Sequence, residues 1–85
     1  MTPAKILEQV AEIVADTIGL DTLILTPATT AADVEGWDSL ANVQIFVALD
    51  KRFGIRFRTG EMAPIRKVGE LVKRIEGRIN VLRTE

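Results

Sequence analysis

With 85 residues, a mass of 9.4 kDa and a net charge of −1, the chain is expected to form a single domain, residues 1–85, with little room for a complete enzyme active site. Its composition, 47% hydrophobic and 27% charged, favours a folded, soluble domain, and no apolar run approaches the roughly 20 residues that span a bilayer, so membrane insertion is not expected. Because cysteine, histidine and tyrosine are all absent, serine hydrolases, thiol hydrolases and zinc fingers are nearly excluded.

The first predicted element is a helix over residues 3–18. Its apolar residues recur at steps of three and four, as in a helix that buries one face: Ile6, Leu7, Val10, Ile13, Val14 and Ile18. Thr2 can cap this helix, Pro3 suits its first turn, and Gly19 can end it. Residues 20–38 show no sustained period and predict a long loop with one short turn. Apolar residues in this loop lead us to expect an ordered connector that packs across the helix ends: Leu20, Leu23, Ile24, Leu25 and Val34.

A second helix is predicted over residues 39–53, with Asp38 as its cap and Gly54 as its end. A short helical turn is expected within residues 59–63, before Pro64, and a last helix is expected to begin near Val68. No alternating strand pattern longer than residues 55–57 competes with these helices. The sequence therefore predicts an all-α protein, a small four-helix bundle of three long helices and one short helix, with a long loop between the first two.

The apolar residues of the second predicted helix form two stripes. On a helical wheel, one stripe lies between about 140° and 240° from Leu40 and holds Ile45, Phe46, Leu49 and Phe53. The other stripe consists of Leu40, Val43 and Val47. A small bundle can bury one broad face of a helix, so the first stripe is the expected core and the second is expected to face outward. A partner protein or another part of this chain could cover the second stripe, and the wheel alone gives both equal weight.

Charge is unevenly distributed along the chain. Residues 1–50 carry one basic and eight acidic side chains, a balance of −7, whereas residues 51–85 carry ten basic and four acidic side chains, a balance of +6. The basic residues alternate with apolar ones, and the only aromatic residues after Asp50 are Phe53 and Phe57. Nucleic-acid binding is not expected, because there is neither a basic run nor a stacking platform. The N-terminal residues lack the pattern of a secretory signal, which predicts a cytoplasmic protein.

The motif Gly36-Trp37-Asp38-Ser39-Leu40 stands where the loop meets the second helix, which places the Ser39 hydroxyl in the first helical turn. A phosphate would be favoured there, because free N–H groups and the positive end of the helix dipole stabilise an anion by about 0.3–1 kcal/mol. Aspartate followed by serine is also an ordinary helix start, and on these residues alone we favour the plain cap. Trp37 is expected to be a half-buried anchor of the loop in preference to a partner contact.

Three short motifs, in their spacing, resemble the acyl carrier protein family. They are the motif around Ser39, Phe53-Gly54-Ile55 fourteen residues after the serine, and Val68-Gly69-Glu70. The first helix and the long loop are similar to that family as well, so the resemblance covers essentially the whole chain. It implies a carrier protein and not an enzyme, with Ser39 esterified by a 4′-phosphopantetheine arm taken from coenzyme A. The thiol of that arm would hold acyl groups as thioesters, which a chain without cysteine cannot do alone.

The resemblance also implies partners and site residues. The expected partners are a phosphopantetheinyl transferase and the enzymes that load and transfer acyl groups, with the carrier acting as a monomer and without a metal. The docking surface would consist of Asp38, Leu40, Val43, Gln44 and Val47. A pocket for the acyl chain would involve Ile65, Leu49 and Phe53, although plain core packing explains Ile65 equally well.

Some positions depart from the family pattern. Members that serve fatty acid synthesis usually carry acidic residues at the places of Ala41 and Gln44, whereas this chain has neither and adds Arg56 and Arg58. Generic fatty-acid partners are therefore expected to dock poorly, and a dedicated lipid, fatty acid, polyketide or aminoacyl pathway is favoured. Arg66 and Lys67 stand where a threonine cap is common, which leaves the start of the last helix open. The alternatives are an aminoacyl or peptidyl carrier and an unmodified helical interaction module.

Overall fold

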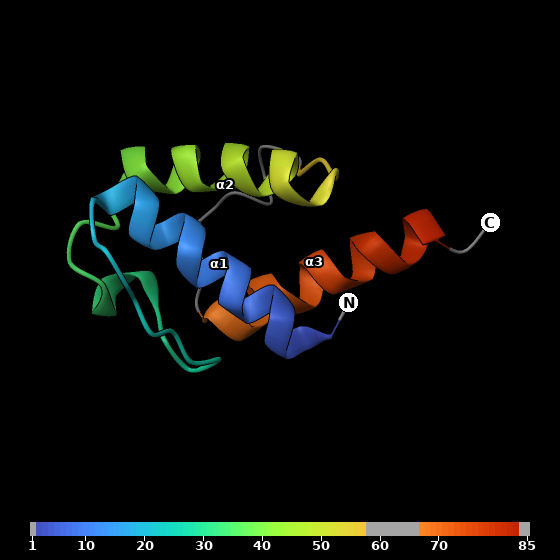
Figure 1. Ribbon diagram of the computed structural model, residues 1–85, viewed down its shortest axis with the longest axis horizontal. Coiled ribbons are helices and arrows are strands. Elements are labelled where there is room, and N and C mark those ends of the chain that lie inside the picture. The colour runs from blue at the N-terminus through green and yellow to red at the C-terminus, as the bar shows by residue number, and fades with distance from the viewer. Residues whose placement is uncertain (1, 58–66, 84–85) are drawn as a thin grey trace.

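The computed structural model describes residues 2–57 and 67–83, with side chains described up to residue 79. These residues form three α-helices and no strand: α1 (Pro3–Ile18), α2 (Ser39–Phe53) and α3 (Val68–Arg83). α1 packs against both other helices and crosses them obliquely, running leftward in Figure 1 while α2 and α3 run rightward. The predicted all-α fold is confirmed, while the short helical turn expected within residues 59–63 lies outside the described residues.

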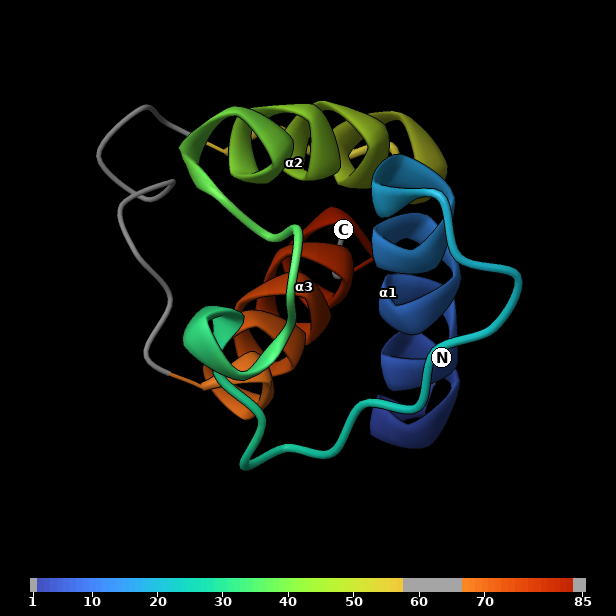
Figure 2. The same ribbon diagram turned by 90° about the vertical axis from the view of Figure 1, so that its left-hand side faces the viewer.

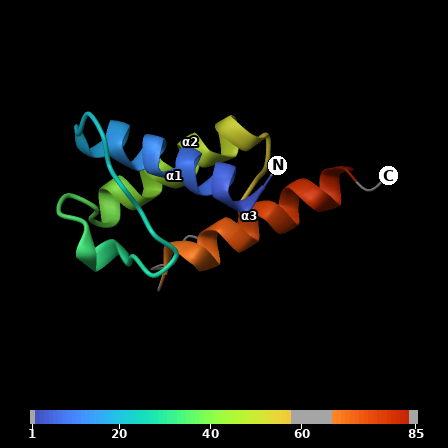
Figure 3. The ribbon, with the colours of Figure 1, turned by 60° about the horizontal axis from the view of Figure 1, so that its bottom comes forward.

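The long connection from α1 to α2 occupies one end of the molecule (Figure 2). The first turn of α1 and the last turns of α2 and α3 lie toward the opposite end (Figure 3). Within residues 2–57 and 67–83, no helix combines the length and the apolar character needed to cross a membrane.

The ends of α1 and α2 follow the predicted capping signals. The Thr2 side chain caps α1 by accepting a hydrogen bond from the backbone N–H of Lys5 at 3.3 Å. α1 ends at Gly19 and α2 at Gly54, and both glycines have a positive φ, 81° and 64°. The predicted ranges, 3–18 and 39–53, therefore agree with the structure at both ends.

The core lies between the three helices and contains the buried face of each. α1 contributes Ile6, Val10, Ile13 and Val14, and α3 contributes Val68, Leu71, Val72 and Ile75. From α2, the side chains of Ile45, Phe46 and Leu49 are fully buried. The rings of Phe46 and Phe57 meet edge to face with centroids 5.1 Å apart, a favoured aromatic geometry. The first stripe of α2 is thus the core stripe, with Phe53 half-buried at its end.

Hydrogen bonds within the long loop explain why it is ordered. A turn at Pro27 is closed by two bonds: Thr29 N–H donates to the Thr26 carbonyl, and Thr26 N–H donates to Thr29 Oγ1, both at 3.0 Å. The short 3₁₀ helix η1 (Ala31–Asp33) follows, and an Asp33 carboxylate oxygen accepts from Thr30 N–H at 3.0 Å. The sequence predicted one short turn in this loop, and the structure contains the turn at Pro27 as well as η1.

Burial of the loop side chains is uneven. Leu25 and Val34 join the core, and Leu23 packs against it, which confirms an ordered connector that crosses the helix ends. Leu20 and Ile24 do not join them, because 47% and 90% of their surfaces are exposed. The ordered connector therefore relies on Leu23, Leu25 and Val34, and Leu20 and Ile24 do not contribute to its packing.

The start of α3 is capped by the backbone of the long loop. Val68 N–H donates to the Thr29 carbonyl at 2.7 Å, and Gly69 N–H donates to the Pro27 carbonyl at 2.9 Å. These bonds satisfy N–H groups that a helix start leaves without an intrahelical partner. A Cβ at position 69 would lie 3.0 Å from the Pro27 carbonyl oxygen, so glycine permits this close approach. Lys67 in place of a threonine cap had left the start of this helix open. α3 begins at Val68, and loop carbonyls take the place of a side-chain cap.

After α2, residues 55–57 are held between α2 and α3. The N–H of Phe57 donates to Asp50 Oδ1 at 3.2 Å, and Arg78 Nη1 donates to the Arg56 carbonyl at 2.6 Å. The Arg78 guanidinium also lies over the Phe57 ring, 5.6 Å from its centroid, within the range of a cation–π contact. Ile55 and Phe57 are buried while the side chain of Arg56 is exposed, so this segment presents a cation next to the end of α2.

Candidate functional site

The motif around Ser39 begins with a close approach to α1. Gly36 has a φ of 96°, a conformation that favours glycine. A Cβ at this position would lie 3.4 Å from Cβ of Ile18, in the last turn of α1. The chain therefore passes against the end of α1 just before it turns into α2.

Trp37 fixes the next position. Its side chain is only 6% exposed, and its indole N–H donates to Asn42 Oδ1, one turn into α2, at 3.0 Å. Its backbone N–H donates to the Val34 carbonyl at 3.1 Å. Trp37 is therefore buried more deeply than expected, and it acts as an anchor that ties the loop to the first turns of α2.

Asp38 is the N-cap of α2, as predicted. Its Oδ1 accepts from Ala41 N–H at 2.8 Å, and its carbonyl accepts from Asn42 N–H at 2.8 Å. The residue remains exposed, so its carboxylate is also open to solvent. The cap and an additional contact with a partner are thus compatible.

Ser39 is the first residue of α2 and the only serine of the chain. The residue is exposed, and its hydroxyl makes no hydrogen bond to any described residue. It stands at the positive end of the helix dipole, where an attached phosphate would be stabilised by about 0.3–1 kcal/mol. A free, exposed hydroxyl in this position fits a residue that carries a phosphate ester.

The second stripe of α2 leads away from Ser39 along the outer face of the helix. Leu40, Val43 and Val47 are 69%, 50% and 45% exposed, and Gln44 beside them is exposed as well. Among the described residues, neither α3 nor the long loop covers this stripe. Of the two interpretations that the helical wheel left open, the structure supports the outward-facing one. We call Leu40, Val43 and Val47 the apolar stripe.

Basic side chains stand at the far end of the apolar stripe. A groove of about 450 Å³ lies there, lined by Val47, Asp50, Lys51, Ile55, Arg56 and Phe57. Lys51 and Arg56 are both exposed, whereas Asp50 is partly buried and bonded to Phe57 N–H. Ala41 is buried, so an acidic residue at its place would lie against the core and would not extend the docking face. The outer face of α2 is therefore apolar near Ser39 and positively charged at its other end.

The residues predicted to line an acyl pocket have different surroundings. Leu49 is fully buried, and Phe53 is half-buried against the same core. Ile65 lies outside the described residues. A pocket formed by these three side chains stays a prediction.

Comparison with known proteins places this geometry in a family. The family model described as "Phosphopantetheine attachment site" matches residues 8–75, which include the whole motif around Ser39. Meromycolate extension acyl carrier proteins of Mycobacterium leprae and Mycobacterium tuberculosis are 29% identical over 76 residues. That alignment covers 89% of this chain and 66% of each relative, so the chain spans slightly less than two thirds of their length.

A solved structure agrees with the sequence comparison. The solution NMR structure of a holo acyl carrier protein from Geobacter metallireducens superposes with a TM-score of 0.79 and 28% sequence identity. The match covers 93% of this chain and 92% of that protein. The three-helix fold is thus that of an acyl carrier protein, and the cofactor of the family is covalently attached 4′-phosphopantetheine. The chain belongs to the phosphopantetheine attachment site family, whose members are carrier proteins and not enzymes.

Proposed function

We propose that this chain is an acyl carrier protein that receives its 4′-phosphopantetheine arm on the hydroxyl of Ser39. The observation that carries the proposal is the sole serine of the chain, exposed and without a described hydrogen-bond partner, at the start of α2. When bound, the arm supplies a flexible thiol that holds an acyl group as a thioester. The chain itself holds the attachment point in place, because Trp37 is bonded to Asn42 and Asp38 to Ala41 in the first turns of α2.

The apolar stripe is the surface through which the partner enzymes would dock. It begins at Leu40, next to Ser39, so an enzyme that covers the stripe would have the attachment point within its footprint. Exposed apolar side chains on one helix face are typical of docking surfaces. Asp38 and Gln44 border the stripe and complete the proposed contact with the transferase and with the acyl-loading and acyl-transfer enzymes.

Charge at the far end of the stripe would select among these enzymes. Lys51 and Arg56 would repel an enzyme that docks through a basic patch and attract one with acidic residues at the matching place. The mycobacterial relatives are named for meromycolate extension, which supports a specialised lipid pathway over general fatty acid synthesis. We further propose that the carrier acts as a monomer in the cytoplasm, where coenzyme A is available.

The acyl chain itself would be sheltered by the core. Leu49 and Phe53 belong to the hydrophobic cluster below α2, and Ile65 follows in the segment that leads to α3. An acyl chain that enters there would replace contacts that Leu49 and Phe53 make within that cluster. This part of the proposal is supported by burial and by the family resemblance.

Modification in vitro tests the attachment site. The chain is incubated with a broad-specificity phosphopantetheinyl transferase, coenzyme A and Mg²⁺, and its intact mass is measured before and after. We expect the wild-type chain and a hydroxyl control, Thr22→Ala, to gain one arm, and Ser39→Ala to gain none while retaining its helical circular dichroism spectrum. A wild-type chain that is never modified would favour the unmodified interaction module, and a modified Ser39→Ala would move the attachment site elsewhere.

A further inference from the structure

A second surface feature has none of the residues of the apolar stripe in its lining. It is a groove of about 550 Å³ between the outer face of α1 and residues 20–25 of the long loop. Residues of α1 line it in two parallel rows, each with a spacing of four, which places each row on one face of the helix. The apolar row consists of Leu7, Ala11 and Ala15, and the acidic row consists of Glu8, Glu12 and Asp16. We call this feature the α1 groove.

The loop forms the other wall of the α1 groove. Ile24 and Leu20, the two apolar loop residues that stay outside the core, both line it and are 90% and 47% exposed. Asp21, between them, is exposed as well. The loop wall thus repeats the composition of the helix wall, with apolar side chains accompanied by an acid. Together with Leu7 of α1, Ile24 and Leu20 form a cluster of apolar side chains around one groove, which is more indicative of a binding surface than a single exposed residue.

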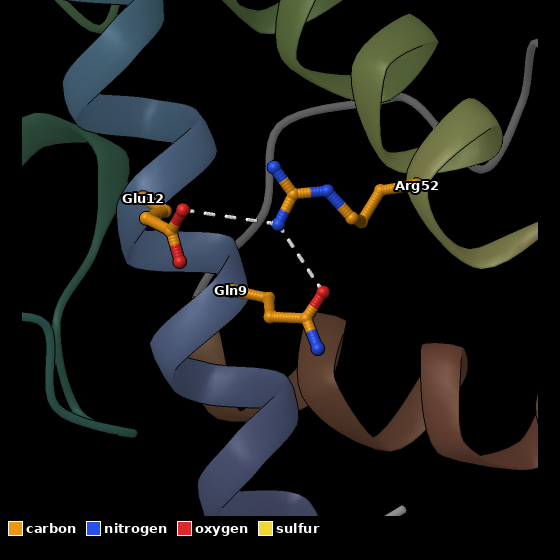
Figure 4. Close-up of polar contacts among 3 residues, drawn as sticks. All are labelled: Gln9, Glu12 and Arg52. Carbon is orange, nitrogen blue, oxygen red and sulfur yellow. Dashed lines mark hydrogen bonds and ion pairs between the residues drawn. The ribbon is translucent and has the colours of Figure 1, made fainter.

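The charge of the α1 groove is strongly negative. Four carboxylates line it, and Arg52 is the only cation among the described lining residues, so the balance is −3. Arg52 reaches over from α2 toward Glu12 and Gln9 of α1 (Figure 4). Its Nη1 lies 4.0 Å from Glu12 Oε1 and donates to Gln9 Oε1 at 3.2 Å. A guanidinium thus already lies beside one carboxylate of the acidic row, and Glu8, Asp16 and Asp21 are the other three acids of the lining.

We propose that the α1 groove binds a basic amphipathic helix of a partner protein. Apolar side chains of that helix would lie on the floor formed by Ala11 and Ala15, whose small size lets a second helix approach closely. Its lysines or arginines would face the acidic row and Asp21. From Leu7 to Ala15 the row rises through eight steps of 1.5 Å, about 12 Å, which corresponds to roughly two turns of a partner helix.

The α1 groove is separate from the proposed docking surface on α2. None of its lining residues belongs to the apolar stripe, and Ser39 is not among them. A partner could therefore hold the carrier by the α1 groove while the stripe and the attachment point stay accessible to another enzyme. The negative rim disfavours nucleic acid and acidic proteins at this surface for the same electrostatic reason that it favours a basic helix.

A synthetic peptide can test the proposal on the full chain. We would titrate ¹⁵N-labelled protein with a 14-residue peptide that carries leucine on one helical face and lysine on the other, and follow the amide chemical shifts. The expected shifts are confined to residues 7–16 and 20–25, and the apparent Kd rises at least fivefold between 50 and 300 mM NaCl. A peptide of the same composition in shuffled order, which has no apolar face, serves as the first control and should bind at least fivefold more weakly.

Matched variants localise the binding. Ile24→Ser, and separately Glu8→Gln combined with Asp16→Asn, should each weaken peptide binding at least fivefold. Leu40→Ser and Glu35→Gln change similar exposed side chains outside the groove and should leave the Kd within twofold. All groove variants should still be modified on Ser39 at the wild-type rate, so the outcome is independent of the proposed function.

Several results would overturn the proposal. They are shifts centred on α2, equal binding of the shuffled peptide, and no binding at millimolar peptide. Self-association of the chain, seen by sedimentation together with shifts in the α1 groove that depend on protein concentration, would instead assign the groove to a second copy and would also overturn it.

Discussion

The two faces of α2 predict opposite consequences for the same chemical change. Leu49 and Leu40 belong to one helix, and each can be shortened to alanine, which removes the same atoms and has the same effect on helix propensity. Leu49 is fully buried, whereas Leu40 is 69% exposed. The pair therefore isolates burial as the variable.

The size of each effect follows from that burial. Leu49→Ala removes a buried side chain from the core and is expected to cost about 2–5 kcal/mol of unfolding free energy. Less than a third of the Leu40 surface is covered. Since full burial of leucine contributes about 1.5–3 kcal/mol, and alanine retains part of the contact, Leu40→Ala should cost only about 0.5 kcal/mol. A domain of this size has roughly 4–13 kcal/mol in total, so only the first change threatens the fold.

Thermal unfolding followed by circular dichroism measures both variants. About 4–8 °C per kcal/mol is typical for a small domain, so Leu49→Ala should lower Tm by at least about 8 °C and Leu40→Ala by no more than about 4 °C. Leu40→Ala, which remains folded, should instead slow the attachment of phosphopantetheine severalfold, because it shortens the apolar stripe. Equal losses of Tm would show that Leu40 is a core residue, and an unchanged attachment rate would remove it from the docking surface.

Three further predictions concern the helix ends and the surface charge. Gly69→Ala should lower the unfolding free energy by about 1–3 kcal/mol, because its Cβ would lie 3.0 Å from the Pro27 carbonyl oxygen. Gly77→Ala, whose Cβ would have nothing within 4 Å, should raise the unfolding free energy by about 0.5–1 kcal/mol. Urea unfolding measures both variants, and equal effects would contradict the close approach at Gly69. Asp38→Asn should keep the cap and the stability, while Asp38→Ala should lose about 0.5–2 kcal/mol. If the Asp38 carboxylate also contacts the transferase, Asp38→Asn and Asp38→Ala should both slow the attachment of phosphopantetheine. A wild-type attachment rate in Asp38→Asn would show that Asp38 acts only as the helix cap. Lys51→Glu combined with Arg56→Glu should increase, at low salt, the rate of acyl transfer with a fatty-acid ketosynthase that docks through a basic patch. The increase should be smaller at high salt, which screens these charges. An unchanged transfer rate would mean that these charges do not govern docking.

Local signals made the helices predictable. Thr2 and Asp38 cap the first two helices, and the spacing of apolar residues identifies the buried face of each helix. These signals are encoded within one or two turns of the chain, so they can be read without knowing the fold. Periodicity also separated Leu40 and Val47 from the core stripe, but it left open whether another part of the chain covers them, and only their exposure in the structure decides this.

Contacts between distant segments were not predictable in this way. The cap of α3 comes from carbonyls of Pro27 and Thr29, some forty residues earlier in the chain, so no local pattern announces it. The bond from Arg78 to the Arg56 carbonyl likewise depends on how α3 passes the end of α2. The α1 groove could have been suspected from the spacing of its acidic row, but only the loop that lies beside α1 turns that row into a groove.

The attachment of the arm to Ser39 is the central claim, and the mass of one peptide tests it most directly. The protein is isolated from its own cells and digested, and the peptide that contains Ser39 is analysed by mass spectrometry. We predict one 4′-phosphopantetheine on that peptide, and any additional acyl mass on the arm would reveal the cargo. An unmodified Ser39 peptide, or phosphopantetheine found on a different peptide, would contradict the claim.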